Sequence, residues 1–275
     1  MNREFLEQHN LMIFDLDGTL YEGREHFRLH TNNLKANLDE SEQEQFENLY
    51  TDVLNGNHPL QIGKVYDGKR DLIWTWDPFT AQLTEAHDWN GEKINVTDAP
   101  NAIPASDFDF MNWVPIGDGW WTPYAIARHF GISPEVIQAS YVQTKDQMSN
   151  EKGFLQRTPG LKEYLESIVN DYTLIVCTNS DEVDAQRLLD FLGLEQYFTE
   201  LIPSAQKPVY TKTIFEDVLH RFQVKPENAV SIGDNFMNEI APALQLGMSA
   251  MWLTDAQIKP VDDDRLVLVD TLAQS

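Results

Sequence analysis

Short apolar runs bounded by polar residues recur along the chain and alternate with stretches of helical spacing. Apolar runs of about four to eight residues are typical of strands that are buried on both faces of a sheet. Such runs predict strands near residues 11–16, 172–177, 229–233 and 249–253. After Lys207-Pro208, Ile214, Val218 and Phe222 fall on one face of a predicted helix. Strands that alternate with helices predict an α/β fold, a three-layer sandwich around a mainly parallel, Rossmann-like sheet.

A long segment, residues 22–154, separates the first predicted strand from the others. Apolar stripes predict helices near both of its ends, the last of them running from Pro134 to Met148. Residues 64–76 predict a β-hairpin around a tight Asp-Gly turn, and residues 77–119 look irregular. We therefore predict two domains, a discontinuous core of residues 1–21 and 155–275 and an insertion of residues 22–154.

The first predicted strand ends in two aspartates, Asp15 and Asp17, followed by Gly18. Because side chains alternate along a strand, both carboxylates would leave its end on the same side. Two neighbouring carboxylates repel each other unless a positive charge lies between them, and a hard divalent cation is the usual partner. The alternative is an ordinary Asp-Gly turn with solvated acids.

Three later segments bring further polar groups to comparable positions. Thr178-Asn179 follows the second strand, Lys207 opens the predicted helix, and Asp234 follows the third strand with Glu239 shortly after it. In an open parallel sheet, ligand chemistry collects at the carboxyl ends of the strands. We therefore expect all of these segments to face one crevice.

This ordered set resembles the motifs of the haloacid dehalogenase superfamily, specifically its phosphatase branch. The resemblance implies that Asp15 is the nucleophile and that Asp17 is the general acid and base. It also implies that Thr178 holds the phosphoryl group, that Lys207 clamps the phosphate, and that Asp234 binds magnesium. The part of the chain that carries the resemblance is residues 1–20 and about 155–275.

The family's last motif usually ends in a second aspartate, where this chain has Glu239 with a longer reach. The resemblance implies Mg²⁺ as the cofactor and a small phosphate monoester, such as a sugar phosphate or nucleotide, as the substrate. Hydrolysis would pass through an aspartyl-phosphate intermediate. The implied metal ligands are Asp15, Asp17, Asp234 and Glu239, and the implied substrate contacts are Thr178, Asn179 and Lys207. Four acids that face a phosphate dianion need a cation between them.

The insertion resembles the cap domain of this family, which selects the leaving group. Six of the seven tryptophans lie in the insertion. They either fill its core or offer flat faces to a substrate, and Trp120 and Trp121 are the candidates for the second role. Glu22, His26 and His30 are spaced by four residues. On a helix they would share a face, either as a transition-metal site or as ordinary polar residues.

Composition restricts the partners. The net charge of −24 at pH 7 argues against nucleic acid or an anionic membrane as a partner. No apolar run reaches membrane-spanning length, and the first residues lack a signal-peptide pattern. The single cysteine, Cys177, cannot form an internal disulfide, which suits a reducing compartment and predicts a cytoplasmic enzyme. The sequence does not indicate an oligomeric state.

Two other functions remain open. A phosphomutase shares the aspartyl-phosphate chemistry but returns the phosphoryl group to its substrate. A non-catalytic binding protein would keep only the fold. The intact set of Asp15, Asp17, Thr178, Lys207 and Asp234 argues against the second alternative.

Overall fold

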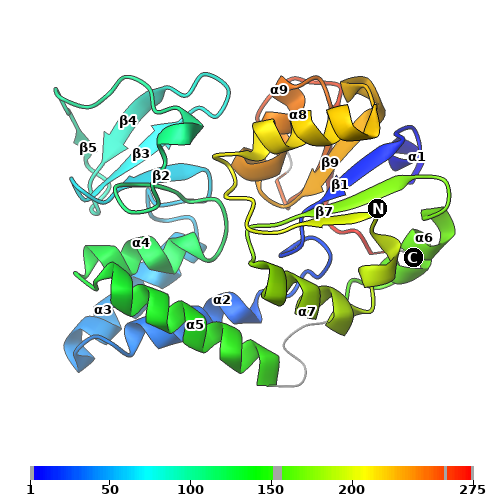
Figure 1. The fold of residues 1–275 in the computed structure, drawn as a ribbon. Coiled ribbons are helices and arrows are strands. Elements are labelled where there is room, and N and C mark those ends of the chain that lie inside the picture. Colours follow the sequence, from blue (N-terminus) through cyan, green and yellow to red (C-terminus); the bar gives the residue numbers. More distant parts are fainter. Residues whose placement is uncertain (1–2, 151–156, 257–258, 274–275) are drawn as a thin grey trace. The chain divides into compact units, whose positions relative to one another are not determined.

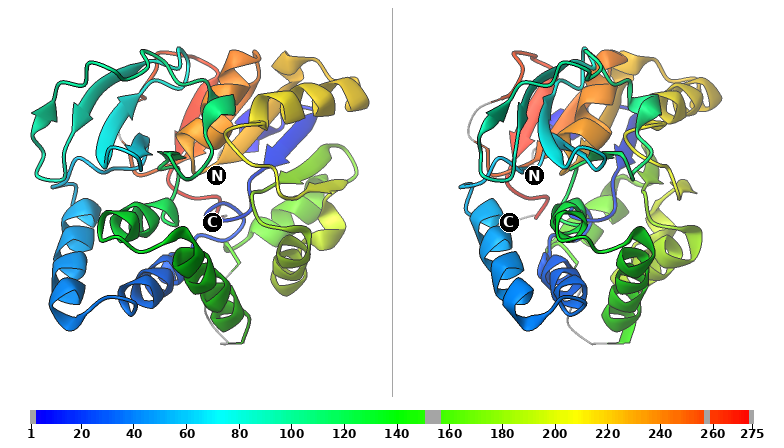
Figure 2. Two further views of the ribbon diagram at one scale, coloured as in Figure 1. Left: turned by 60° about the vertical axis from the view of Figure 1, so that its left-hand side comes forward. Right: turned by 90° about the vertical axis from the view of Figure 1, so that its left-hand side faces the viewer.

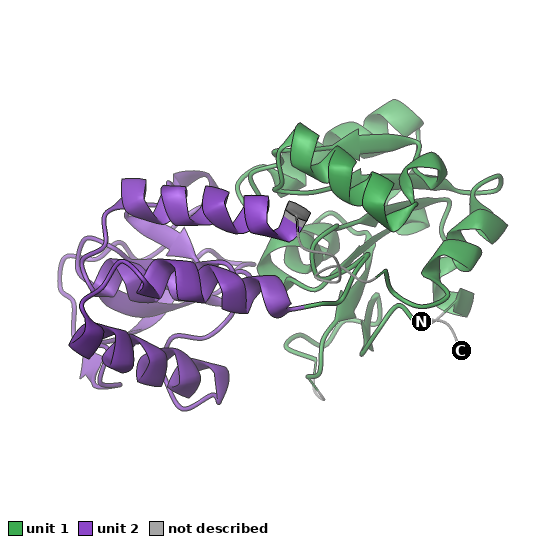
Figure 3. Cartoon of the chain, turned by 90° about the horizontal axis from the view of Figure 1, so that it is seen from below, with its two compact units in different colours: residues 1–23, 155–275 green, residues 24–154 purple. Residues whose placement is uncertain are grey.

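The computed structural model describes residues 3–150, 157–256 and 259–273 of the 275-residue chain. The chain divides into two units, which Figure 3 distinguishes by colour. Unit 1 contains residues 1–23 and 155–275, and unit 2 contains residues 24–154. The breaks predicted from the sequence lay after residues 21 and 154.

Unit 1 is built on a six-stranded sheet in which all neighbouring strands are parallel. In spatial order the strands are β11 (Leu266–Val269), β10 (Ser249–Leu253), β9 (Ala229–Gly233), β1 (Leu11–Phe14), β7 (Thr173–Cys177) and β8 (Glu200–Ile202) (Figure 1). The four predicted strands are β1, β7, β9 and β10. The edge strands β8 and β11 were not predicted. β8 has only three residues, none fully buried, whereas β11 is an apolar run of four residues that was not assigned as a strand.

Helices cover both faces of this sheet and give the three layers of the predicted sandwich (Figure 1). The helices of unit 1 are α1 (Arg3–Leu6), α6 (Leu161–Ile168), α7 (Glu182–Leu192), α8 (Thr211–Phe222) and α9 (Ala241–Gln245). α8 and α9 lie on one face of the sheet, and α6 and α7 lie on the other. On the first face, Phe215 and Val218 of α8 pack in one apolar core with Leu11 and Ile13 of β1. The predicted fold class is confirmed.

The register of the sheet brings three chain segments to one edge. β1 lies between β7 and β9, and Phe14 at its end is in register with Val176 and Ile232. The residues that follow these three strands at the carboxyl edge of the sheet are Asp15, Thr178 and Asp234. Parallel strands therefore place the predicted chemical groups of unit 1 side by side.

Unit 2 contains a five-stranded antiparallel sheet, which can be followed in the views of Figure 2. In spatial order its strands are β5 (Lys93–Ile94), β4 (Leu83–His87), β3 (Leu72–Trp76), β2 (Lys64–Asp67) and β6 (Trp113–Pro115). β2 and β3 form the predicted hairpin. The expectation that residues 77–119 are irregular is wrong, because β4, β5 and β6 lie there. β4 and β5 carry exposed polar or charged residues, and β6 has only three residues, so no period-two apolar pattern marks these strands.

Helices pack on the sheet of unit 2. They are α2 (Glu25–Lys35), α3 (Glu40–Leu54), α4 (Trp121–His129) and α5 (Pro134–Asn150). Unit 2 also contains the short 3₁₀ turn η1 (Ala105–Asp107), and unit 1 contains η2 (Glu195–Tyr197) and η3 (Pro226–Asn228). α3 begins with a capping box between Asp39 and Glu42. Phe46 of α3, Ile126 of α4 and Ile73 of β3 belong to one buried core.

Tryptophans fill much of unit 2. Trp76 is buried and its Nε1 donates to the carbonyl of Ile103 at 3.0 Å. Trp89 stacks on His129 with ring centroids 4.1 Å apart, and its Nε1 donates to Asp71 at 2.8 Å. These residues have the packing role that the sequence left open as one of two readings.

Candidate active site

The candidate site is centred on Asp15, which follows β1. Its backbone N–H donates to the carbonyl of Ile232 at 2.9 Å and so continues the sheet ladder by one residue. The side chain is buried, and its Oδ1 accepts a hydrogen bond from Lys207 Nζ at 2.7 Å. Its Oδ2 accepts a longer one from the Thr19 hydroxyl at 3.4 Å. One carboxylate oxygen is therefore anchored by a cation and the other is held weakly.

Lys207 is a fixed, buried cation. Its Nζ donates to Asp15 Oδ1, to Glu239 Oε1 at 2.6 Å and to the carbonyl of Cys177 at 3.0 Å. An ammonium group has three donors, so these contacts use all of them. Burial works to lower the pKa of Lys207, but the charges of Asp15 and Glu239 outweigh it and hold that pKa well above its usual value. Lys207 thus remains charged at neutral pH.

Asn179 holds the loop that carries Lys207. Its Oδ1 accepts from the backbone N–H of Lys207 at 2.6 Å, and its Nδ2 donates to the Lys207 carbonyl at 3.1 Å. The helix α8 begins at Thr211, so Lys207 lies on the loop before the helix that it was predicted to open. These paired bonds tie the loop to the end of β7.

Glu239 is the partner of Lys207. It lies in a π-helical turn, η4 (Phe236–Ile240), and its Oε2 accepts from the backbone N–H of Asn235 at 3.1 Å. Both of its oxygens therefore have protein donors. A Cβ on Gly233 would lie 2.8 Å from Glu239 Cγ, so only glycine leaves room for this side chain. Burial raises the pKa of Glu239 above its usual value, although the Lys207 ammonium opposes the rise.

The Asp15 carboxyl experiences three competing effects. Burial raises its pKa, the Lys207 ammonium draws it back, and the neighbouring Asp17 adds to the rise. The net effect is a pKa above the usual value for an aspartate. An additional positive charge near Asp15 would therefore favour the ionised form that a nucleophile needs.

Two hydroxyl groups hold the carboxylate of Asp17. Tyr21 donates to Oδ1 at 2.5 Å, and Ser180 donates to Oδ2 at 3.1 Å. Burial and the charge of Asp17 hold the pKa of Tyr21 well above its usual value, so its hydroxyl stays protonated. Sequence reasoning missed both donors. The only signals were the spacing of four residues from Asp17 to Tyr21 and the place of Ser180 in the polar tail of β7.

Thr178 lies at the end of β7 and is buried. Its backbone N–H donates to the carbonyl of Ile202 at 3.0 Å, and its hydroxyl oxygen accepts from the backbone N–H of Ser180 at 3.1 Å. Because the oxygen acts as an acceptor there, the hydroxyl proton is left to donate to an anion.

Asp234 lies against the loop that follows β1. A Cβ on Gly18 would overlap the Asp234 carboxylate, and the φ of Gly18 is +77°, so two constraints select glycine here. The Asp234 carbonyl accepts from Trp252 Nε1 at 2.9 Å, which fixes the backbone behind the carboxylate. The loops after β1 and β9 are therefore in close contact.

These positions test whether the residues suit a metal. Among residues 3–150, 157–256 and 259–273, no three His, Cys, Asp or Glu side chains are grouped to hold an ion. Of the four predicted ligands, Asp17 is bonded to hydroxyls and Glu239 to Lys207. Asp15 is also bonded to Lys207, but through Oδ1, and its Oδ2 accepts the longer bond from Thr19 at 3.4 Å. Asp234 supplies a second carboxylate at the end of the neighbouring strand. Mg²⁺ is usually held by one or two carboxylates together with waters and substrate phosphate, so this all-oxygen pair fits it.

The second suggested metal set is not assembled. Glu22 precedes α2, and its carboxylate accepts from the Thr271 hydroxyl at 2.7 Å and from the Leu272 N–H at 2.8 Å. His26 and His30 lie on α2, and His30 Nδ1 is 3.3 Å from the Thr144 hydroxyl. Glu22 therefore does not share a helix face with the two histidines.

A family model described as haloacid dehalogenase-like hydrolase matches residues 9–247 of this chain. The chain belongs to the haloacid dehalogenase-like hydrolase family. The match covers both the β1 loop and the Asp234 motif, so the resemblance inferred from the ordered motifs is confirmed.

Two curated relatives share part of the sequence. The glyceraldehyde 3-phosphate phosphatase of Methanothermobacter thermautotrophicus is 32% identical over 113 residues, 38% of this chain and 49% of the relative. The protein of the same name from Pyrococcus furiosus is 25% identical over 114 residues, 40% of this chain and 47% of the relative. The chain thus spans about half the length of the curated relatives that it matches.

Solved structures share the fold over nearly the full chain. The magnesium-bound HAD-hydrolase YfnB of Bacillus subtilis has a TM-score of 0.56 at 14% identity, with 96% of this chain and 95% of that chain covered. A haloacid dehalogenase-like family hydrolase of Xanthomonas campestris has a TM-score of 0.50 at 17% identity, covering 96% of this chain and 91% of that chain. In the part of the chain that the structure describes, no helix is both long and apolar enough to cross a membrane.

Proposed function

We propose that this hydrolase is a Mg²⁺-dependent phosphatase that cleaves a small phosphate monoester through an aspartyl-phosphate on Asp15. One observation carries the proposal. The Asp15 carboxylate has one oxygen fixed by a buried lysine, and the carboxylate of Asp17, two residues away, is held by two hydroxyls. A fixed nucleophile beside a positioned acid suits phosphoryl transfer, which depends mainly on alignment and charge neutralisation.

In the first step, an oxygen of Asp15 attacks the phosphorus atom. An Asp15–phosphorus bond forms, the phosphorus–oxygen bond to the leaving group breaks, and protonated Asp17 gives its proton to the departing alkoxide. Tyr21 and Ser180 fix the direction in which the Asp17 carboxyl points. The products of this step are the alcohol and an acyl phosphate on Asp15.

In the second step, Asp17, now a carboxylate, takes a proton from water as the water attacks the phosphorus atom. The bond between phosphorus and Asp15 breaks, inorganic phosphate is released, and both aspartates return to their starting states. Splitting the reaction in this way replaces one difficult displacement by two easier ones.

The other residues support these steps. Lys207 would orient Asp15 and neutralise charge, Glu239 and Asn179 would position Lys207, and the Thr178 hydroxyl would donate to a phosphoryl oxygen. Asp15 and Asp234 would hold Mg²⁺. When bound, Mg²⁺ would neutralise phosphoryl oxygens and offset the repulsion between the acids and the substrate.

We also propose residues 22–154 as the family's cap and a small phosphate ester as the substrate class. The names of the two curated relatives support this class, and glyceraldehyde 3-phosphate is the first compound to test. We further propose a cytoplasmic location, with which the free cysteine Cys177 is consistent. Burial raises the pKa of the Cys177 thiol to about 12, so it is unreactive.

The deciding experiment measures inorganic phosphate released from a panel of phosphate monoesters. With Mg²⁺, the wild-type protein should release phosphate from at least one ester. Chelator should abolish the activity, and Ca²⁺ should restore it poorly because it prefers looser coordination. Asp15→Asn should lose at least about a thousandfold in kcat, because a carboxamide is a poor nucleophile.

The matched control is Asp264→Asn, which makes the same chemical change at an exposed position of unit 1. It should keep wild-type activity. Release of a phosphate isomer without free phosphate would identify a phosphomutase instead. Full activity in chelator, or turnover by Asp15→Asn, would contradict the proposed mechanism.

A further inference from the structure

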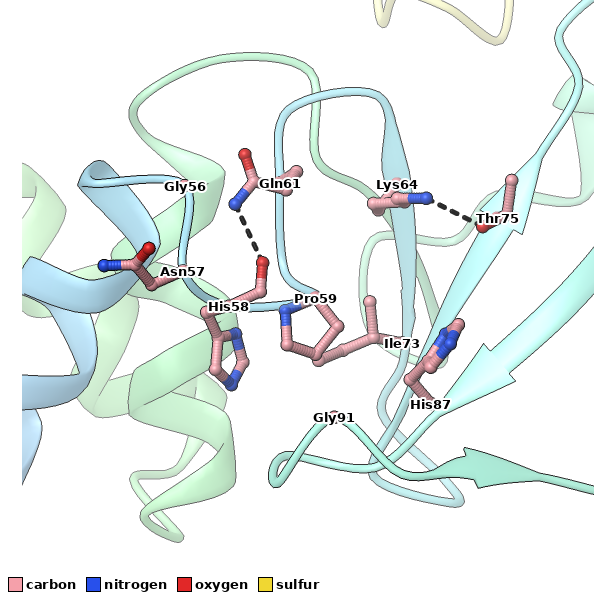
Figure 4. Close-up of a pocket in the computed structure, with 10 residues that line it drawn as sticks. All are labelled: Gly56, Asn57, His58, Pro59, Gln61, Lys64, Ile73, Thr75, His87 and Gly91. Carbon is pink, nitrogen blue, oxygen red and sulfur yellow. Dashed lines mark hydrogen bonds between the residues drawn. The ribbon is translucent and has the colours of Figure 1, made fainter.

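A pocket of about 430 Å³ is lined entirely by residues of unit 2, none of which takes part in the proposed mechanism (Figure 4). Its lining comes from the loop between α3 and β2 and from the sheet strands β2, β3 and β4, with Gly91 beyond β4. Pockets that bind small ligands usually have volumes of about 300–1,000 Å³. The pocket is therefore large enough for a small organic molecule.

Three polar side chains, Lys64, Thr75 and His87, come from the strands on one side of this pocket, and Lys64 points toward Thr75 (Figure 4). The antiparallel register places Lys64 of β2 opposite Thr75 of β3, and His87 of β4 opposite Ile73 of β3. Since residues two apart share a face of a strand, Lys64, Thr75 and His87 share one face of the sheet. The arrangement comes from strands rather than from a flexible loop.

Lys64 and Thr75 have hydrogen-bond donors that the bond between them does not use. Lys64 Nζ donates to the Thr75 hydroxyl at 2.7 Å, which leaves two ammonium hydrogens and the hydroxyl proton of Thr75. Within the described parts of the chain, Lys64 forms no ion pair and the His87 ring forms no hydrogen bond. Burial lowers the pKa of Lys64, as expected for a cation that lacks a close counter-charge.

The remaining lining does not supply that counter-charge. None of the ten lining residues is acidic. The nearest acid that influences Lys64 is Glu85, which is exposed and paired with Lys93 at 2.6 Å. His58 is occupied, because its Nδ1 accepts from the Leu60 N–H at 3.0 Å and its Nε2 donates to the Trp89 carbonyl at 3.0 Å.

We propose that this pocket binds a small organic anion whose carboxylate or phosphate group is held by Lys64, Thr75 and His87. Ile73 and Pro59 would contact its carbon skeleton, and Gln61 and the loop would close the opposite side. A charge-assisted hydrogen bond to a partly desolvated ammonium gives both affinity and selectivity for an oxyanion. The site does not depend on the proposed phosphatase activity.

The test uses the full-length protein with ¹³C-methyl-labelled isoleucine and follows the Ile73 δ1 methyl resonance, assigned with an Ile73→Val variant. Inorganic phosphate, malonate and glycerol are titrated at constant ionic strength. Phosphate or malonate should shift the Ile73 resonance saturably, while glycerol should not. The anion that binds more tightly shows whether the pocket prefers a phosphate or a carboxylate group. The Ile73 methyl reports on unit 2, whereas Asp15 belongs to unit 1.

Variants of two lysines test whether anion binding depends on the charge of Lys64. Lys64→Gln should weaken the preferred anion by at least about tenfold, whereas Lys64→Arg should retain most of the affinity. Lys69→Gln, which removes one exposed lysine from the same hairpin, should stay within about twofold of the wild type. The proposal is overturned if neither anion shifts Ile73 at about 50 mM, if glycerol acts equally well, or if Lys69→Gln weakens binding as much as Lys64→Gln.

Discussion

Tyr21 and Ser180 each donate a hydrogen bond to Asp17, and hydrogen bonds to a carboxylate favour its ionised form. Removing one donor should let Asp17 keep its proton to higher pH. For Tyr21→Phe, we therefore expect the alkaline limb of kcat/KM for an alkyl phosphate to move up by about one pH unit. The measurement is the pH profile of phosphate release, compared with that of the wild type.

Tyr172→Phe is the matched control, since it removes a hydroxyl that donates to the carbonyl of Glu7 at 3.4 Å in the same unit. Its pH profile should follow the wild type. Ser180→Ala should shift the limb in the same direction as Tyr21→Phe. Unchanged limbs in both Tyr21→Phe and Ser180→Ala would show that these hydroxyls do not act through Asp17.

Asp17→Asn separates the two steps of the proposed reaction. The change is nearly isosteric, and the Tyr21 and Ser180 hydroxyls can rotate to meet the amide. Alkyl phosphates should then react slowly, because their leaving groups need a proton. An aryl phosphate needs little help to leave, so a burst of phenol should precede slow phosphate release. Wild-type rates on alkyl phosphates would contradict the acid–base role of Asp17.

Sequence patterns predicted the catalytic residues that directly follow a strand more readily than the side chains that bond to the catalytic residues. Asp15 and Asp234 follow apolar runs, so the strand pattern itself pointed to them. Tyr21 and Ser180 reach Asp17 from different segments, and no local pattern says that their hydroxyls converge. The pairing of Glu239 with Lys207 likewise depends on how the β9 loop folds back over Gly233.

At the level of elements, continuous apolar runs predicted the buried central strands and failed at the edges. β1 is buried along its whole length, whereas β8 has no fully buried residue and only two apolar residues, too few to form an apolar run. In unit 2, β4 and β6 pair with strands that the sequence did predict, β3 and β2. Their pairing depends on the tertiary context rather than on local propensity.

The packing of α2 in unit 2 predicts a pH-dependent stability. Burial and the neighbouring His26 lower the pKa of His30 to about 3, and His30 also faces Thr144 and Tyr141 of α5 and Trp120. Below about pH 6.5 the unfolded chain binds a proton that folded His30 does not, so stability falls as the pH is lowered. Between pH 7 and 5 this loss should be about 2 kcal/mol.

In His30→Gln, the loss of unfolding free energy from pH 7 to 5 should shrink by about this amount. Urea unfolding followed by tryptophan fluorescence reports on unit 2, which contains six of the seven tryptophans. His87→Gln is the control, because His87 is also in unit 2 but is less buried. An equal pH dependence in His30→Gln and the wild type would show that His30 titrates normally in the folded state.

At the scale of the whole chain, the net charge of −24 opposes the compact state through self-repulsion. Exposed ion pairs such as Lys93–Glu85 act in the other direction, but ion pairs in contact with solvent contribute little to stability. Salt screens both effects, because the Debye length falls from about 30 Å at 0.01 M to about 3 Å at 1 M. Since acidic residues outnumber basic ones by 44 to 20, relief of repulsion should dominate.

We therefore expect the urea midpoint of unfolding at pH 7 to rise as sodium chloride is increased from about 0.01 M to about 1 M. Tryptophan fluorescence follows unit 2, and far-UV circular dichroism follows the whole chain. Potassium chloride should give the same rise, because screening depends on ionic strength rather than on the identity of the cation. A rise with only one of the two salts would indicate specific ion binding. A falling midpoint would mean that the ion pairs contribute more to stability than the excess negative charge removes.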